Sequence, residues 1–453
     1  MILQNIKSTD IFDKSDVFSV ASLLCFFLYI ILLDIAYVTI LIPMYGYAGF
    51  VLEYTPSTVI VGFFMTACVY ICMPKKMSTV SDFVLTGIAF LAIIPYISYY
   101  SFGGGSFAFT AMSFLMFIAV IAFVRLTPNI SLPTFSQKTA DVIFTILLWG
   151  AVAYVFITCI SAMGFSNLSL DFSTIYERRA VFKESGVAGS YLMTWSGNAI
   201  FPCSIAYFLY RKRYINVLAA ACSALFIFAV SGMKSILFGS IMVLAVYILL
   251  HVKQKMSLIA FLFVLAVFIT MILFYVFDEI IPFSYVIRRL AFIPAKVSNQ
   301  HFDFFMQEGP IQMGNSIFSS VIPYPYESDP ADIIGSLYYI SGETHANSGV
   351  FADGFTNFGY FGAFLWTIIF ALLMKLQDVV SYDKPFYVTA GCFALYITIF
   401  TNSALFTSIM THGFLVALVL VALIPKTSKK TKEEVSESDG ETCMCDDQCS
   451  SCG

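Results

Sequence analysis

The sequence predicts an all-α polytopic membrane protein with about twelve transmembrane helices and two long outer loops. Hydrophobic residues make up 59% of the 453 positions and charged residues only 11%, whereas a soluble domain carries roughly 25% charged residues. Apolar runs long enough to cross a ~30 Å hydrocarbon core recur along the chain. The net charge of −4 gives no basic excess for a polyanion, so the composition argues against a soluble enzyme and against a nucleic-acid-binding protein.

Twelve apolar runs define the expected helices. The first run is long and contains Asp34, so we expect it to be tilted or broken. The seventh and eighth runs are short and are separated only by Met233 and Lys234. In chain order, the predicted spans are Val17–Ile42, Ser57–Met73, Phe83–Ile97, Ser106–Val124, Val142–Met163, Tyr191–Tyr210, Ile215–Gly232, Ser235–Leu250, Ser257–Phe277, Phe355–Met374, Phe386–Ser403 and Phe406–Ile424.

The distribution of Lys and Arg predicts the orientation, because cytoplasmic loops of membrane proteins collect these residues. With both termini in the cytoplasm, every inner segment is basic and the outer side holds only seven of the 24 Lys and Arg residues. No small-residue cleavage site follows the first apolar run, so we expect no cleaved signal peptide. The sequence therefore predicts a multi-pass protein of the plasma membrane.

Two outer loops are long, Gly164–Ser190 and Asp278–Gly354, while most other connections are tight. Loops of this length in a compact protein are usually functional or disordered. The second loop is too rich in aromatic and apolar residues to be disordered. We expect it to form short interfacial helices interrupted by prolines, at Pro282, Pro294, Pro310, Pro323, Pro325 and Pro330.

The C-terminal tail differs in composition from the transmembrane domain, residues 1–425. Residues 426–453 are charged, Ser-rich and nearly free of apolar side chains, which predicts a disordered cytoplasmic tail. Thiolates suit zinc and other soft metals, but structural zinc sites usually have folded sequence between their two Cys pairs. A reduced, solvated tail is therefore the preferred interpretation, with metal binding as the alternative, for Cys443, Cys445, Cys449 and Cys452.

Basic residues on the outer side are the first candidates for a functional site, because the positive-inside distribution disfavours them there. Arg grips phosphate through two parallel hydrogen bonds, so clusters of this kind indicate a cavity for an anionic group. Lys234 interrupts an apolar stretch at membrane depth, where ionisable groups are costly. The alternatives are solvated loop charges and a lysine snorkelling at a helix end. The three clusters are Arg178, Arg179 and Lys183; Lys234; and Arg288, Arg289 and Lys296.

A polar segment of the second outer loop is the other candidate. His345 is a possible general base for a sugar hydroxyl, and Asp353 or Glu343 is a candidate carboxylate to orient it. Asn347 and Asn357 would orient a sugar or the base. The alternative is a loop whose Asn and Asp side chains cap the next helix.

Several further polar residues are weaker candidates. We interpret His301 as an interfacial residue and His412 as a hydrogen-bonded packing residue inside the last helix. Four polar residues of the spans could line a cavity or satisfy one another across helices, namely Asp34, Asn198, Thr401 and Asn402.

Local motifs at these residues resemble the O-antigen and oligosaccharide repeat-unit polymerases of bacteria. The resemblance covers the hydropathy of Val17–Ile424 and, in local sequence, several shorter stretches, of which the Asn-Phe-Gly segment is the most similar. Lys234 stands where members of the family often have Arg. The matching stretches are Tyr176 to Arg179 with Gly189, Ser231 to Ser235, Arg288 to Pro294, His345 to Gly349 and Asn357 to Gly362.

The resemblance implies a glycosyltransferase of the bacterial inner membrane with a GT-C-like architecture. It would join oligosaccharide repeat units carried on polyprenyl diphosphate, such as undecaprenyl diphosphate, for O-antigen, lipopolysaccharide or capsule biosynthesis. Chain-length regulator and flippase proteins would be its partners. His345 would act as base, with Asp353 orienting, and the diphosphate would be bound by Arg178, Arg179, Lys234, Arg288 and Arg289.

No cofactor is expected in such an enzyme. Glu53 is the only acidic residue of the outer segment Pro43–Pro56, which lacks the acidic pair by which many membrane glycosyltransferases hold a divalent metal. A metal-independent reaction is therefore preferred.

Other functions stay open. An O-antigen ligase-like glycosyltransferase shares the architecture and the chemistry. A lipid-linked oligosaccharide flippase or an ion-coupled carrier is a different class, and it would bury charges midway through several helices. Here the charges gather in the outer loops instead, which favours the enzyme. A membrane scaffold or sensor has the least support, because the tail is short.

Overall fold

The computed structural model describes residues 20–164, 168–171, 174–187, 190–252, 256–315, 321–339 and 345–427. The regular secondary structure of these residues is helical, with no strand among them; Glu53 and Gly103 form an isolated bridge. Eight of the described helices are long and apolar enough to cross a membrane, and three shorter apolar helices accompany them. An all-α, multi-pass membrane protein is therefore confirmed, while a total of twelve spans stays a prediction.

Each of the twelve predicted apolar runs overlaps a helical segment. The first run continues past Asp34 without a break, because the carboxylate accepts a hydrogen bond from Ser98 Oγ (2.5 Å) inside the bundle. The segments of the first half are α1 (Val20–Ala36), η1 (Tyr37–Leu41), α2 (Ile42–Tyr45), η2 (Gly46–Ala48), α3 (Pro56–Cys72), α4 (Val80–Ile88), η3 (Ala89–Ile93), α5 (Ile94–Phe102), α6 (Phe107–Leu126), α7 (Gln137–Met163), α8 (Ile175–Glu184), α9 (Tyr191–Trp195), η5 (Ser196–Ile200) and α10 (Phe201–Tyr210).

The second half contains the long outer loop. The predicted short break between α11 and α12 is confirmed, but it consists of Gly232 and Met233, because Lys234 is already the first residue of α12. The segments are α11 (Tyr214–Ser231), α12 (Lys234–Val252), α13 (Met256–Phe277), α14 (Ile281–Phe283), η6 (Ser284–Phe292), α15 (Ile293–Glu308), α16 (Pro330–Tyr338), α17 (Val350–Ser381), α18 (Phe386–Asn402), α19 (Leu405–Ile409) and α20 (Phe414–Leu423).

Four prolines stand inside helices that remain continuous. Each follows a π-helical turn by two residues, at Pro43, Pro95, Pro202 and Pro294. A proline ring clashes with the carbonyl one turn earlier and offers no N–H, and the extra residue of a π-turn accommodates both defects. The expectation that Pro294 interrupts a helix of the second long loop is therefore wrong, since η6 runs directly into α15.

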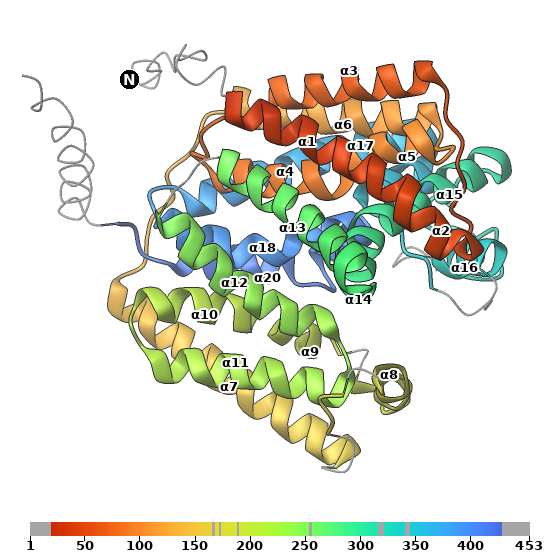
Figure 1. Cartoon of the computed structure of the whole chain (residues 1–453). Helices are drawn as coiled ribbons and strands as arrows, with labels where there is room; N and C mark the ends of the chain where they lie inside the picture. Colours follow the sequence, from red (N-terminus) through yellow and green to blue (C-terminus); the bar gives the residue numbers. More distant parts are fainter. Residues whose placement is uncertain are drawn as a thin grey trace, which may run out of the picture.

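The helices form two groups joined by α18 (Figure 1). One group holds α1, α3 to α6, α13 and α17, with α17 packed against α6 and α1 against α13. The other holds α7 and α9 to α12, with α11 packed against α7 and α10. Helix α18 packs against α12 on one side and α4 on the other. The core is thus continuous across both groups.

The segments of the two long loops lie at the same end of the molecule. Helices α8, α14, α15 and α16 gather at the right of Figure 1, whereas the two ends of the described chain lie at the left. This arrangement agrees with the predicted topology, in which both termini face one side and both loops face the other. Which end faces the cytoplasm stays a prediction.

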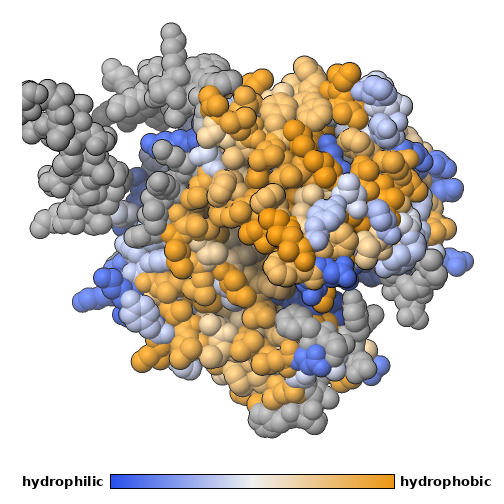
Figure 2. All heavy atoms as spheres, viewed as in Figure 1, coloured by the Kyte–Doolittle hydropathy of each residue, from blue (hydrophilic) through white to orange (hydrophobic). Residues whose placement is uncertain are grey.

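Apolar side chains cover most of the visible surface between these two ends (Figure 2). Large examples such as Phe64, Ile71 and Ile146 are about two-thirds exposed. A soluble protein rarely exposes so wide an apolar surface. The bilayer is therefore the plausible environment of this face.

Candidate functional site

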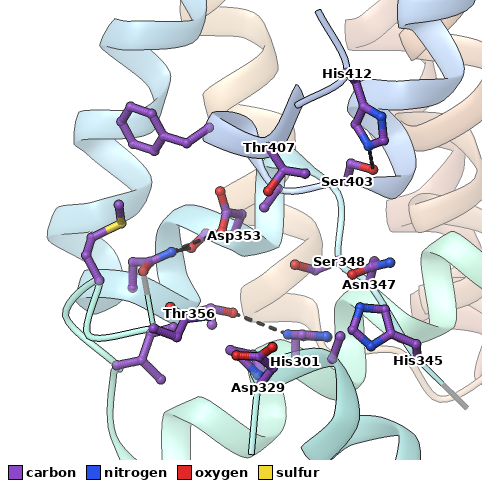
Figure 3. A pocket seen from close by; sticks show the side chains of 18 residues that line it. His301, Asp329, His345, Asn347, Ser348, Asp353, Thr356, Ser403, Thr407 and His412 are labelled. Carbon is purple, nitrogen blue, oxygen red and sulfur yellow. Dashed lines mark hydrogen bonds between the residues drawn. The ribbon is translucent and has the colours of Figure 1, made fainter. Parts of the chain in front are cut away.

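A polar cavity of about 500 Å³ lies at the end that carries the long loops. Its walls come from α15, the start of α16, the segment 345–348, the start of α17 and the turns around α19, and three of the chain's four histidines line it. Figure 3 shows the labelled side chains entering this space from several elements. The lining residues are His301, Ile311, Met313, Asn315, Asp329, Pro330, Ala331, His345, Asn347, Ser348, Asp353, Thr356, Asn357, Ser403, Ala404, Phe406, Thr407 and His412.

His345 pairs with a carboxylate at the mouth of this cavity. Its Nδ1 lies 2.6 Å from Oδ1 of Asp332, on α16. A carboxylate only accepts, so Nδ1 carries the hydrogen, and in the neutral imidazole Nε2 keeps its lone pair. The two side chains are 55% and 53% exposed. The pair is therefore an oriented imidazole that solvent or a bound ligand can reach.

Asp353 does not orient His345, contrary to the expectation that it was a candidate partner. Its Oδ1 accepts from Asn357 Nδ2 (3.0 Å), and its Oδ2 accepts from Trp366 Nε1 (2.6 Å) and the backbone N–H of Leu405 (2.8 Å). Leu405 is the first residue of α19, so the carboxylate caps that helix from a neighbouring one. The other candidate partner, Glu343, lies outside the described residues.

The two predicted asparagines also line the cavity, from different positions. Asn347 is exposed on the segment before α17, while Asn357 is buried on the first part of α17. Helix α17 kinks directly after Asn357, where Gly359 has φ +60° and ψ −145°. Only glycine adopts this conformation readily. The kink separates the short cavity-lining part of α17 from its longer apolar part.

His301 is buried in the cavity wall, and its imidazole joins two neighbouring segments. Nε2 donates to the carbonyl oxygen of Ala346 (2.8 Å), and Nδ1 lies 3.5 Å from Thr356 Oγ1 on α17. Burial lowers the pKa of His301 from 6.5 to about 4. The imidazole is therefore neutral near pH 7. His301 is a buried residue of the cavity wall and not the interfacial residue that the sequence predicts.

His412 occupies a break in the last apolar run. The expectation that it lies inside a helix is wrong, because α19 ends at Ile409 and α20 begins at Phe414. Its ring nitrogens contact Ser403 Oγ (3.1 Å) and Asn198 Nδ2 (3.4 Å). Three helical segments thus meet at this histidine on the cavity wall.

Arg178 caps a helix. Its guanidinium donates to the carbonyl oxygens of Phe228 (3.0 Å) and Ala229 (2.7 Å), at the C-terminus of α11, and to that of Asp171 (2.8 Å). The side chain is buried. Cations near a helix C-terminus satisfy its last carbonyls and its dipole. This geometry favours a structural role over contact with a substrate.

Two of the remaining predicted cations, Lys234 and Arg289, meet at the ring of Tyr285, and a third contacts the chain close to Lys234. Lys234 Nζ donates to Tyr285 Oη (2.5 Å), and the guanidinium carbon of Arg289 lies 6.0 Å from the centre of the same ring. Arg179 Nε donates to the carbonyl of Gly232, two residues before Lys234. We call Arg179, Lys234, Tyr285 and Arg289 the basic cluster.

Two other basic residues of the second long loop have contacts of their own outside this cluster. Arg288 donates to Ser284 Oγ (3.0 Å) and lies over the Tyr45 ring at 4.4 Å. Lys296 is buried, donates to the Ala48 carbonyl and faces two aromatic rings, so burial lowers its pKa to about 8. Lys296 therefore holds the loop together. The side chain of Lys183 lies outside the described residues, as does the Cys-rich tail.

None of the predicted cations whose side chains the structure describes lines the cavity described above. The two regions are nevertheless connected through η5. Ile236 of α12 packs on Gly197, and the adjacent Asn198 contacts His412 in the cavity wall. The residues predicted from the sequence therefore belong to two regions, the polar cavity and the basic cluster.

Two residues of these regions were not among the sequence predictions, Asp332 beside the cavity and Tyr285 in the basic cluster. Asp332 follows an Asp-Pro pair that opens α16, a common helix start, and this is the only local signal for it. Nothing in the local sequence distinguishes Tyr285 from the many other aromatic residues. No group of three or more His, Cys, Asp or Glu that could hold a metal occurs within the described ranges.

The four weaker polar candidates of the predicted spans were expected either to line a cavity or to satisfy one another, and the structure shows both. Asn402 Nδ2 donates to Thr401 Oγ1 (2.9 Å), so these two satisfy each other, as Asp34 and Ser98 do. Only Asn198 reaches the cavity wall, through His412.

Comparison with known proteins finds no match to this chain among family models, curated proteins or solved structures.

Proposed function

We propose that this protein is an integral-membrane glycosyltransferase that joins oligosaccharide repeat units carried on polyprenyl diphosphate. The observation that carries the proposal is the His345–Asp332 pair at the mouth of a polar cavity, at the end of a membrane-embedded helix bundle. A carboxylate that fixes the imidazole tautomer is the arrangement of a general base. We place this site on the outer face of the bacterial plasma membrane, with both termini in the cytoplasm.

The proposed reaction is a single displacement at the anomeric carbon of the donor. A hydroxyl of the acceptor sugar attacks that carbon, and the bond to the diphosphate oxygen breaks. His345 Nε2 takes the hydroxyl proton, while Asp332 stabilises the imidazolium that forms. Asn347 and Asn357 are placed on the cavity wall to hold sugar hydroxyls.

The basic cluster is the proposed binding site of the leaving diphosphate. Lys234 and Arg289 meet at Tyr285, and Arg179 is adjacent. Charged donors aimed at developing negative charge are among the strongest contributors to catalysis. Diphosphate is already a good leaving group, so binding and charge stabilisation are sufficient. Arg178 and Arg288 support this region through their own contacts.

The apolar face supports a lipid-linked donor. Helices α12 and α13 follow each other in the chain, yet α12 packs mainly against α18 and α13 mainly against α1. Figure 2 shows a recess lined by apolar residues between these two helices. α12 begins at Lys234, and η6, which carries Arg289, follows α13. A polyprenyl chain in this recess would bring its diphosphate to the basic cluster.

The test is complementation in a host whose surface polysaccharide depends on the gene. We expect His345→Ala and Asp332→Asn to abolish or shorten the polysaccharide ladder at equal protein levels, with kcat for His345→Ala reduced about 10²- to 10⁴-fold. Glu308→Gln, an exposed carboxylate on α15 outside the cavity, is the matched control. A full-length ladder from His345→Ala would reject the assigned base, and a normal ladder in the deletion strain would reject the function.

The accumulated product separates the related functions. A polymerase defect leaves single repeat units on the lipid, whereas a defect in an O-antigen ligase leaves unattached polymer. A flippase or carrier would move lipid-linked oligosaccharide across vesicles without forming a glycosidic bond. The purified protein in nanodiscs, given synthetic polyprenyl-diphosphate oligosaccharide, should form that bond without an added partner.

A further inference from the structure

His301 contacts the backbone that carries the proposed base. It is buried on α15, and its Nε2 lies 2.8 Å from the carbonyl oxygen of Ala346, the residue directly after His345. Because a carbonyl oxygen only accepts, Nε2 must carry the hydrogen. This leaves Nδ1 as an acceptor, and Thr356 Oγ1 faces it at 3.5 Å. His301 therefore holds one defined tautomer between two segments.

Ala346 is also held through its backbone N–H, which belongs to the preceding peptide unit. The backbone N–H of Ala346 donates to the carbonyl of Ala331 (2.9 Å), which directly precedes Asp332. His345 and Asp332 are thus the chain neighbours of two residues that are bonded to each other. The hydrogen bond from His301 fixes the Ala346–Asn347 peptide unit, and together with the Ala346–Ala331 bond it fixes the position of the His345–Asp332 pair.

His301 is poorly placed to act as a base itself. Both of its nitrogens face protein groups at hydrogen-bonding distance, Ala346 through Nε2 and Thr356 through Nδ1. Its buried ring also lies against Phe305, with the ring centres 5.9 Å apart. His345, by contrast, has one nitrogen on Asp332 and a half-exposed side chain.

We infer that His301 is a positioning residue for His345, acting as a neutral Nε2–H donor that clamps the Ala346 carbonyl. The inference rests on the proposed function for its kinetic consequence, but not for its structural one. Displacing a reacting group by about 1 Å can cost about 100-fold in rate without changing substrate affinity. Loss of the clamp should therefore lower kcat and leave the KM for the lipid-linked donor nearly unchanged.

The test compares three variants. His301→Gln keeps an N–H donor at the position of Nε2, whereas His301→Leu removes it and His301→Asn places the amide near Nδ1, short of Ala346. We expect kcat to fall about 10- to 100-fold in His301→Leu and in His301→Asn, with donor KM within about twofold. His301→Gln should stay within about threefold of the original kcat. Thr356→Val removes only the weaker contact and is the matched control.

Hydrogen–deuterium exchange supplies a readout that needs no turnover. The Ala346 N–H should exchange faster in His301→Leu and His301→Asn, and at the original rate in His301→Gln. Equal exchange in all variants, or equal kcat losses in His301→Gln and His301→Asn, would overturn the inference. If the original protein forms no glycosidic bond, the proposed function fails, while the exchange rates still decide whether His301 clamps this peptide.

Discussion

At the scale of single residues, the surroundings of a side chain decide whether it can meet a substrate. Arg178 and His345 lie in the two long loops, and the sequence predicts that both take part in the site. The guanidinium of Arg178 is taken up by the carbonyls that end α11, whereas His345 is half exposed on a cavity. Charge and residue type alone do not distinguish these two situations.

Arg178→Ala should destabilise the fold rather than impair donor binding. The substitution leaves buried carbonyl oxygens at the C-terminus of α11 without donors, which costs about 1–3 kcal/mol. Thermal unfolding in detergent measures this loss. Arg179→Ala, an exposed neighbour, should keep the original Tm. An unchanged Tm for Arg178→Ala together with a raised donor KM would instead make Arg178 a phosphate ligand.

His301 should make the stability depend on pH. Its folded pKa of about 4 lies below the ordinary value of 6.5. As pH falls below 6.5, the unfolded chain binds a proton that the folded protein does not bind. The free energy of unfolding should therefore decrease between about pH 6.5 and 4, by roughly 3 kcal/mol in total.

The measurement is the Tm in detergent between pH 4 and 7.5 for the original protein and for His301→Gln. Asp303 on the same helix and Asp329 on the cavity wall are present in both proteins, so their titration cancels in the difference. The Tm difference between the two proteins should narrow or reverse toward low pH. A Tm difference that stays constant across this pH range would show that protonation of His301 does not lower the stability.

At the scale of elements, glycine and proline control where the site can form. Gly359 kinks α17, and the 22 residues beyond it, 360–381, span about 33 Å as a helix, which matches a ~30 Å hydrocarbon core. The first part of α17, with Asp353 and Asn357, is thereby left to line the cavity. Gly354 and Gly362 face each other across the kink so closely that a Cβ on Gly362 would lie 1.9 Å from the Gly354 carbonyl oxygen.

Asp353→Asn tests the link between α17 and α19. An amide keeps only one of the two acceptor oxygens, so either Asn357 Nδ2 or the pair of donors from Trp366 and Leu405 loses its acceptor. We expect the free energy of unfolding to fall by about 1–3 kcal/mol and the emission of Trp366 to change. Trp366→Phe identifies this signal among the chain's three tryptophans. Unchanged emission and stability would show that the cap is dispensable.

At the scale of the whole molecule, the sequence predicts the membrane helices well and the site in part. Hydrophobic runs suffice for the helices, because lipid imposes a length and an apolar surface on each one. The convergence of Lys234 and Arg289 on Tyr285, and the pairing of His345 with Asp332, depend on how distant segments pack. Neither is encoded in a local spacing, so the sequence supplied the residue types but not the pairs.

The separation of the cavity from the basic cluster predicts two kinds of kinetic defect. Lys234→Gln and Arg289→Gln should each raise the donor KM about tenfold, equivalent to about 1.4 kcal/mol. Their double variant should lose less than the product, because both residues contact Tyr285. Lys234→Gln combined with His345→Ala should be multiplicative in kcat/KM. Additivity within the cluster, or strong coupling to His345, would contradict the two-region arrangement.

The half exposure of the His345–Asp332 pair has a consequence for turnover. In the proposed reaction, each glycosidic bond leaves one proton on the imidazole, and a buried base would need a relay to discard it before the next cycle. Because the His345 and Asp332 side chains are both about half exposed, that proton would pass directly to bulk water. An enzyme that extends a chain repeatedly would then need no second group to restore its base.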